Sequence, residues 1–284
     1  MTIFGDAGPW LLGLLALAAL AYAIGLARLW RNAGAGRGIR RGEALRFALG
    51  WLVLAVALAS PLDDLADRLL AAHMVQHELL MTVAAPLFVL GRPLEAWAWA
   101  LPAGFLRALA AFARARPLRG AWRVITEPLP AWSIQAIVLW AWHAPILFDA
   151  ALENEAVHIA QHACFLGSAL LLWWSVFGRG ARRPDGASIA SLFTTMIHSG
   201  ALGALLTFAP HRWYPHYTGG ASLTALEDQQ LGGLVMWVPG GLAYLAAGLA
   251  IVGSWLAPGK AEKGSDPFSS ATATAATGPR GKGI

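Results

Sequence analysis

Six histidines at helix-like spacing are the residues of this chain best suited to chemistry. The sequence holds eight histidines and is 57% hydrophobic, yet these polar groups are gathered rather than scattered. The six are His73, His77, His143, His158, His162 and His198. Imidazole is the commonest metal ligand and carries protons near neutral pH. Because ionisable groups in apolar membrane segments usually face a cavity or a partner, we expect these histidines to form a site.

Two pairs of histidines are spaced for chelation. His73 and His77, like His158 and His162, are four residues apart, so both rings of a pair share one helix face. Each pair can hold one ion, and two pairs on adjacent helices can supply four nitrogens, with His143 in support. Imidazole suits zinc, copper, iron and nickel, and soft sulfur shifts the preference toward Cu(I). The nearby soft donors are Met74, Met81, Cys164 and Met196, of which Cys164 faces away from its neighbouring pair.

Structural roles compete with a metal site. A histidine pair on a membrane helix can simply form hydrogen bonds between helices, and methionines usually serve packing. His211 and His216, in the segment HRWYPHY, are interpreted as interfacial polar groups. His198, near the middle of its helix, is expected to bind metal at greater depth or to relay protons.

The elements that position these residues must be membrane helices. Mean hydropathy is +0.54, only 13% of the residues are charged, and several apolar runs approach the roughly 20 residues that cross a bilayer. The basic residues lie between these runs, so the membrane explains them and no nucleic-acid partner is expected. The single cysteine, Cys164, excludes an internal disulfide framework.

We predict an all-α polytopic bundle of about seven transmembrane helices. The expected spans are 9–30, 44–60, 71–91, 129–147, 156–178, 188–209 and 231–256. Residues 1–256 form one transmembrane domain, in which 93–127 is an amphipathic segment in the cytoplasmic interface. Pro86 and Pro239 lie inside spans and predict kinks. Residues 257–284, rich in small residues, are expected to be a disordered cytoplasmic tail.

Loop charge predicts the orientation. Of the 21 lysines and arginines, 19 follow the first, third, fifth and seventh spans, and only Arg68 and Arg212 lie on the other side. The basic side of a membrane protein is the cytoplasmic one. We therefore expect the N-terminus outside, the C-terminus in the cytoplasm, and all eight histidines at mid-membrane or beyond toward the outer face.

Enzymatic motifs are incomplete in this sequence. His77-Glu78 begins like a zinc-protease motif, but the segment HELLM lacks the second histidine. Glu155 and His158 imitate half of a di-iron site, without a second copy. The sequence contains no phosphate loop, nucleophile elbow or dinucleotide fingerprint. We therefore expect a protein that is not an enzyme.

Several sequence blocks carry a family resemblance. HMVQHELLMTVAAPLFVLGRP, WAWHAPILFDAAL, VHIAQHACFLGSALLLWW, GALLTFAPHRWYPHY and DQQLGGLVMWVPGG occur in this order. Together they resemble the CtaG family of cytochrome c oxidase assembly factors, a polytopic bacterial family linked to caa-type oxidases. The resemblance covers roughly residues 10–256 and implies a multi-pass protein of the bacterial plasma (inner) membrane. It implies functional roles for His73, His77, His143, His158, His162 and Asp228, with Asp228 expected to orient an imidazole.

The leading hypothesis is therefore an assembly factor that holds Cu(I) and passes it to cytochrome c oxidase subunits. An extracytoplasmic copper chaperone is the expected donor, and the lipid bilayer is the other partner. Three alternatives remain open: a b-type haem redox protein with axial histidines from two helices, a transporter of copper or a small solute, and a scaffold whose histidines bind partner loops.

Overall fold

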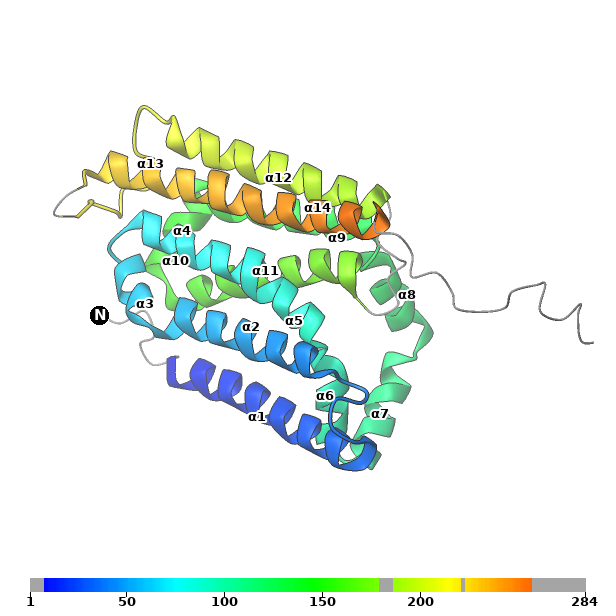
Figure 1. Ribbon diagram of the computed structural model, residues 1–284. Helices are drawn as coiled ribbons and strands as arrows, with labels where there is room; N and C mark the ends of the chain where they lie inside the picture. The colour runs from blue at the N-terminus through cyan, green and yellow to red at the C-terminus, as the bar shows by residue number, and fades with distance from the viewer. Residues whose placement is uncertain (1–7, 179–185, 221–222, 257–284) are drawn as a thin grey trace, which may run out of the picture.

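The computed structural model describes residues 8–178, 186–220 and 223–256 (Figure 1). These residues form helices, and the β-structure among them is a single bridge between Gly219 and Thr224. The predicted all-α bundle is therefore confirmed. The predicted tail, 257–284, lies outside the described residues.

Long apolar helices build the bundle. Six stretches of the described chain are long and apolar enough to cross a membrane, and a bent pair of helices makes a seventh if it is taken as one span. The six are α1 (Gly8–Ala33), α2 (Arg41–Ala59), α4 to α5 (Leu70–Gly91), α11 (Glu155–Phe177), α12 (Gly186–Thr207) and α13 to α14 (Ala225–Leu256). Each corresponds to a segment predicted from hydropathy, which confirms the polytopic architecture. In Figure 1 these helices lie nearly parallel.

The fourth predicted segment is broken by a proline. Helix α9 (Pro128–His143) and helix α10 (Pro145–Glu153) meet at an angle of 71°. Ala144 adopts an extended conformation, as a residue before proline prefers. The helix therefore stops at His143 rather than continuing to 147, and His143 becomes the last residue of α9.

Two spans contain π-helical turns. Segment η1 (Leu79–Ala84) separates α4 (Leu70–Glu78) from α5 (Ala85–Gly91), and η2 (Met236–Gly240) separates α13 (Ala225–Val235) from α14 (Gly241–Leu256). Pro86 is the second residue after η1, and Pro239 lies within η2, so both predicted kinks fall at departures from α-helical geometry. The two spans approach closely there, because a Cβ on Gly240 would lie 2.6 Å from Glu78 Oε2.

The segment 93–127 forms three short helices, α6 (Pro93–Ala100), α7 (Ala103–Ala113) and α8 (Arg116–Ile125). None of the three is long enough to count as a span. Helix α6 packs against α1 so tightly that a Cβ on Gly25 would overlap the carbonyl oxygen of Ala96. Phe105, Leu109 and Phe112 of α7 are exposed, in keeping with an amphipathic segment. Its location in the cytoplasmic interface stays a prediction.

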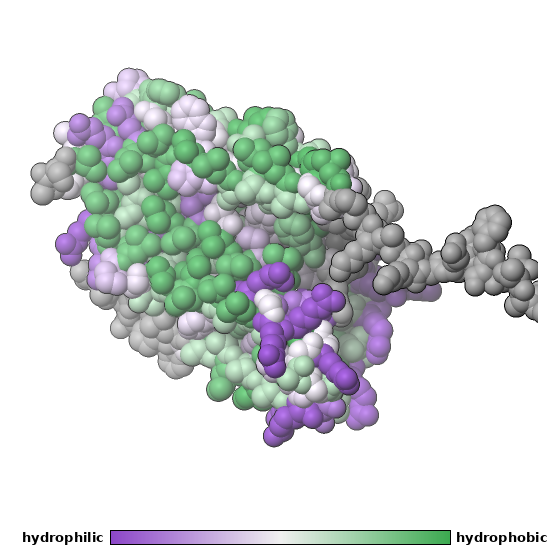
Figure 2. Space-filling model, viewed as in Figure 1, coloured by the Kyte–Doolittle hydropathy of each residue, from purple (hydrophilic) through white to green (hydrophobic). Residues whose placement is uncertain are grey.

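The surface divides as the charge pattern predicts. Figure 2 shows hydrophobic residues over the parallel helices and a hydrophilic group at the end where α2 begins and α6 and α7 lie. Short helix α3 (Pro61–Ala66) and the starts of α4 and α11 lie at the other end (Figure 1). We call these the arginine end and the histidine end. The assignment of the arginine end to the cytoplasm remains a prediction.

Candidate metal centre

Five imidazole rings meet at the histidine end of the bundle. They belong to His73 and His77 of α4, His143 of α9, and His158 and His162 of α11, and are called the histidine cluster below. Ring centroids are 4.3 Å apart within each i, i+4 pair, 5.2 Å apart between His73 and His158, and 5.2 Å apart between His77 and His162. His143 lies 5.9 Å from His77. The two predicted pairs therefore face each other across one helix interface.

Three of these residues already have the spacing of a metal site. Nitrogen atoms of His73, His158 and His162 all lie within 4.8 Å of one another. Metal–nitrogen bonds are about 2.0–2.1 Å long, so three nitrogens at the widest of these separations would each move inward by less than about 1 Å to bind one ion. The residues present therefore fit a metal ion.

The nitrogens of the cluster lack hydrogen-bond partners. His73 is 0% exposed and His77 is 0% exposed, and neither ring nitrogen of either residue makes a hydrogen bond within the described part of the chain. The Nε2 atoms of His143, His158 and His162 are buried and unpaired in the same way. Buried polar groups are nearly always paired, so these nitrogens are placed to accept ordered water or an ion.

One hydrogen bond fixes the tautomer of His143. Its Nδ1 lies 2.7 Å from the carbonyl oxygen of Leu139. A carbonyl can only accept, so Nδ1 carries the proton and donates it. In a neutral imidazole the other nitrogen then has a free lone pair, so Nε2 of His143 is available as a ligand atom.

Helix α4 is held in place by polar contacts from three directions. Asp228 of α13 accepts hydrogen bonds from the backbone nitrogens of Leu70 (2.7 Å) and Ala71 (3.1 Å) at the helix start. Gln76 donates to the carbonyl oxygen of Ala57 and to Asp63 Oδ1 of α3. The Asp228 contacts satisfy helix-end amides that would otherwise be unpaired, and the Gln76 contacts tie α4 to its neighbours. They set the position from which His73 and His77 project.

Asp228 was expected to orient an imidazole. Its two oxygens instead cap the N-terminus of α4, and none of its hydrogen bonds within the described residues goes to a ring. It supports the histidine cluster through the helix that carries His73 and His77.

Aromatic residues close the cluster from outside. Phe148 of α10 and Phe165 of α11 are fully buried and contact several of the rings. In the loop after α12, Tyr214 donates to the carbonyl oxygen of His143 (2.8 Å) and Tyr217 donates to that of Ala66 (3.1 Å). Burial raises the pKa of both tyrosine hydroxyls, so they remain protonated donors. The loop is thereby tied over the site.

Comparison with known protein families identifies the chain. A family model described as cytochrome c oxidase caa3 assembly factor (Caa3_CtaG) matches residues 20–257, which include the whole histidine cluster. The chain belongs to the Caa3_CtaG family. No curated protein and no solved structure matches it. The predicted resemblance is confirmed, and association with a cytochrome c oxidase follows from the role described for the family.

The remaining histidines of this Caa3_CtaG protein lie apart from the cluster. His198 of α12 contacts Trp132 of α9, with ring centroids 5.7 Å apart, and both its nitrogens lack hydrogen bonds within the described residues. His211 and His216 are exposed in the loop after α12. Met74 packs toward α13, where a Cβ on Gly232 would lie 3.2 Å from its Cγ. The structure thus brings five of the predicted site histidines together and leaves His198 outside.

Sequence reasoning missed two glutamines in the Caa3_CtaG site. Both pairs are written H-x-x-Q-H, as HMVQH in α4 and HIAQH in α11, and this shared pattern was the available signal. Gln76 and Gln161 are each 0% or nearly 0% exposed, and the Oε1 atoms of both lack hydrogen-bond donors within the described chain. Gln161 adjoins His73. Gln161 therefore places a further polar group beside His73, whereas Gln76 holds α4 through Ala57 and Asp63.

Proposed function

We propose that this Caa3_CtaG protein receives a Cu(I) ion in its histidine cluster and passes it to a cytochrome c oxidase subunit. Family membership supports the oxidase-assembly part. The observation that supports the copper part is the buried triad His73, His158 and His162, whose nitrogens lie within 4.8 Å of one another and lack partners. In this proposal copper is cargo, and the protein is a carrier rather than an enzyme.

The charge of the donor set favours a monovalent ion. The cluster offers five neutral imidazoles, and the group of mutually close ligands contains no carboxylate among the described residues. Burying a divalent cation without a compensating negative charge costs far more free energy than burying a monovalent one. Imidazole binds copper well. Cu(I) therefore suits this site better than Zn²⁺ or Cu²⁺.

The arrangement also suits release. Five rings surround a site that needs only two to four donors, so one ligand can replace another as an ion moves. His158 and His162 line a small cavity of about 140 Å³ that Asp63 of α3 also lines. In this proposal an ion enters and leaves the cluster past Asp63, on the side where an extracytoplasmic chaperone and the oxidase subunit would dock.

Haem binding, the second candidate, has weaker support. Axial histidines from α4 and α11 are present, but the rings contact one another and Phe148 and Phe165. The cavity touching His158 and His162, at about 140 Å³, is smaller than the roughly 300–1,000 Å³ of pockets for drug-sized ligands. A porphyrin would require the helices to separate. A Soret band in protein purified from haem-replete cells would favour this alternative.

The deciding experiment measures copper on the purified protein. Wild-type protein is loaded with Cu(I) under reducing conditions in detergent, desalted and analysed for copper and protein. We expect one ion per chain, and X-ray absorption with nitrogen neighbours at about 2.0 Å. The double variant His73→Ala/His162→Ala should retain less than a tenth of that copper.

A matched control separates the cluster from the exposed histidines. The double variant His211→Ala/His216→Ala removes the same number of imidazoles and should bind copper as the wild type does. Wild-type protein that retains no copper, or equal losses in the two double variants, would refute the proposal. Oxidase activity of membranes from cells carrying each variant then tests whether copper binding serves assembly.

A further inference from the structure

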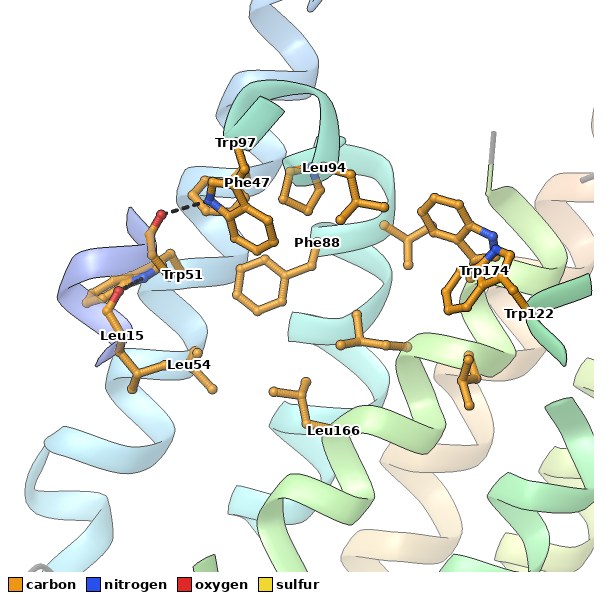
Figure 3. A pocket seen from close by; sticks show the side chains of 15 residues that line it. Leu15, Phe47, Trp51, Leu54, Phe88, Leu94, Trp97, Trp122, Leu166 and Trp174 are labelled. Atoms are coloured by element: carbon orange, nitrogen blue, oxygen red, sulfur yellow. Dashed lines mark hydrogen bonds between the residues drawn. The ribbon is translucent and has the colours of Figure 1, made fainter. Parts of the chain in front are cut away.

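Two neighbouring cavities lie toward the arginine end, apart from the histidine cluster. The first has a volume of about 310 Å³ and lies among α1, α2, α5, α6, α8 and α11 (Figure 3). Its walls are almost wholly apolar, and four tryptophans contribute to them: Trp51, Trp97, Trp122 and Trp174. We call it the tryptophan cavity.

The indole nitrogens do not make this cavity polar. Trp97 donates to the carbonyl oxygen of Ala18 (2.9 Å) and Trp51 donates to that of Leu15 (3.2 Å), as the dashed lines in Figure 3 show. Both bonds fasten α1 to its neighbours and leave the apolar ring faces toward the cavity. The tryptophan cavity therefore suits a hydrocarbon group.

A polar pocket adjoins the tryptophan cavity. Val89 of α5 and Trp174 of α11 line both spaces, so the two spaces meet at these residues. The polar pocket has a volume of about 610 Å³ and is lined by three arginines and two glutamates, which gives it a net charge of +1. Its charged residues are Arg40, Glu43, Arg46, Arg92 and Glu95.

The arginines of the polar pocket differ in their partners. Arg92 pairs with Glu43 (3.2 Å) and Glu95 (3.1 Å) and also donates to the carbonyl oxygen of Gly38. Its single charge is therefore shared between the two glutamates. Arg40 and Arg46, by contrast, have exposed side chains. The positive charge that remains belongs to these two residues and is accessible to an anion.

We propose that the two spaces together bind one anionic phospholipid. An acyl chain fills the tryptophan cavity, and the phosphate lies in the polar pocket against Arg40 and Arg46. The arginine end is the predicted cytoplasmic side, where anionic lipids give the membrane a negative surface. The lipid belongs to the leaflet at the arginine end, and its acyl chain lies between helices of the bundle.

The dimensions exclude a protein helix as occupant. A helix with side chains is about 10–12 Å in diameter, far larger than a cavity of about 310 Å³ admits. A slender acyl chain fits. The neighbouring arginines would give this site a preference for anionic headgroups. The apolar surface that contacts bulk lipid has no such preference.

Native mass spectrometry of the full-length protein tests the proposal. Wild-type protein in detergent is titrated with phosphatidylglycerol or phosphatidylcholine, and the first bound lipid is counted. We expect one tightly bound phosphatidylglycerol molecule per protein chain, and phosphatidylcholine should bind at least tenfold more weakly. The double variant Arg40→Gln/Arg46→Gln should bind phosphatidylglycerol about 10–30-fold more weakly than the wild type. This is the combined effect expected from two basic residues near a membrane surface, each of which favours anionic lipid.

The control for charge is Arg107→Gln/Arg116→Gln, which removes two exposed arginines of α7 and α8 that line neither space. It should bind phosphatidylglycerol as the wild type does. Equal weakening by both double variants would show a diffuse charge effect and overturn the site.

A second pair of variants tests the chain-binding part. Ala18→Phe narrows the tryptophan cavity, whereas Ala16→Phe places the same ring on the exposed face of α1. Phosphatidylglycerol brominated in the acyl chain should quench tryptophan fluorescence strongly in the wild type and in Ala16→Phe, and weakly in Ala18→Phe. Thermal midpoints of all variants show whether each is folded. Quenching unchanged by a folded Ala18→Phe, or equal binding of the two lipids to the wild type, would overturn the proposal.

Discussion

The two ends of the bundle treat buried polar groups in opposite ways. At the histidine end, both nitrogens of His73 and of His77 are buried without hydrogen bonds within the described chain. At the arginine end, Arg92 adopts a left-handed backbone conformation (φ 55°) and its guanidinium contacts two carboxylates and a carbonyl oxygen. One end leaves its polar atoms unpaired, and the other pairs them within the protein.

This difference separates a binding site from a structural one. A paired buried group is complete and contributes to stability, whereas an unpaired one costs about 1–3 kcal/mol until a ligand arrives. The histidine cluster is therefore expected to reduce the stability of the metal-free protein, and the Arg92 network to increase it. Substitutions at the two ends should consequently have opposite effects.

The largest expected effect is at His73. His73→Leu removes two unpaired nitrogens and a triad ligand, so copper binding should fall at least tenfold while the metal-free protein becomes more stable. We expect the thermal midpoint without copper to rise by a few degrees, since about 1 kcal/mol shifts it by roughly 2–4 °C in a protein of this size. Scanning fluorimetry with and without Cu(I) measures both quantities. A lower midpoint without copper would mean that His73 is a structural residue.

At the arginine end the opposite sign is expected. Arg92→Ala removes the partner that Glu43 and Glu95 share and the donor to Gly38, and should cost about 1–2 kcal/mol of stability because these pairs are only partly buried. Copper binding should stay at the wild-type level, because the histidine cluster lies at the other end. Arg107→Ala, at an exposed position of α7, is the matched control and should change neither quantity. A rise in stability from Arg92→Ala would contradict the comparison.

Asp228 links the stability of α4 to the metal site. Asp228→Asn keeps one acceptor oxygen for the amides of Leu70 and Ala71 and loses the other, which should cost about 1 kcal/mol. Since α4 carries His73 and His77, copper affinity should also fall a few-fold while the stoichiometry stays at one ion. Competition with a Cu(I) chelator gives the affinity. Glu153→Gln, at an exposed position at the end of α10, is the control and should leave copper affinity unchanged. An unchanged copper affinity in Asp228→Asn would show that the cap of α4 does not influence the candidate metal site.

The smallest effect concerns pH. Burial raises the pKa of Asp63 to about 6, although its hydrogen bond from Gln76 opposes the shift. The folded protein therefore binds this proton more readily than the unfolded chain, and stability gained through Asp63 at low pH is lost as the pH rises through 6. Asp63→Asn should be more stable than the wild type by a few degrees at pH 7.5 and equal to it near pH 4. A constant difference between the two proteins across this range would exclude Asp63 as its source.

The sequence predicted the spans well because hydropathy and loop charge act over many residues. It placed the last span at 231, however, whereas α13 begins at Ala225. Thr224 and Glu227 form a capping box there, with Glu227 accepting from the Thr224 backbone nitrogen and Thr224 accepting from that of Glu227. Hydropathy does not register this signal, since a capping box is polar.

The candidate site was predictable in membership and not in arrangement. The i, i+4 spacing put each histidine pair on one face of its helix. The contact between the two pairs depends on how α4 and α11, which are far apart in the sequence, pack in the bundle, and spacing does not predict this. The role of Asp228 shows the same limit, because a capping contact with Leu70 spans 158 residues. The π-helical turns also escaped prediction, since nothing in LLMTVA differs from an ordinary apolar helix.

The turn η1 has a consequence for chain length. In it the backbone nitrogen of Ala85 bonds to the carbonyl oxygen of Leu80, five residues back, so the turn contains one residue more than an α-helical turn. Deleting a single residue between Leu79 and Ala84 would restore a regular α-helix and change the phase of α4 against α5 little, because the wide turn already absorbs its extra residue. The surplus residue therefore widens the span locally, at the turn whose Met81 carbonyl oxygen accepts from Trp173 Nε1 (2.8 Å), without changing the faces that α4 and α5 present.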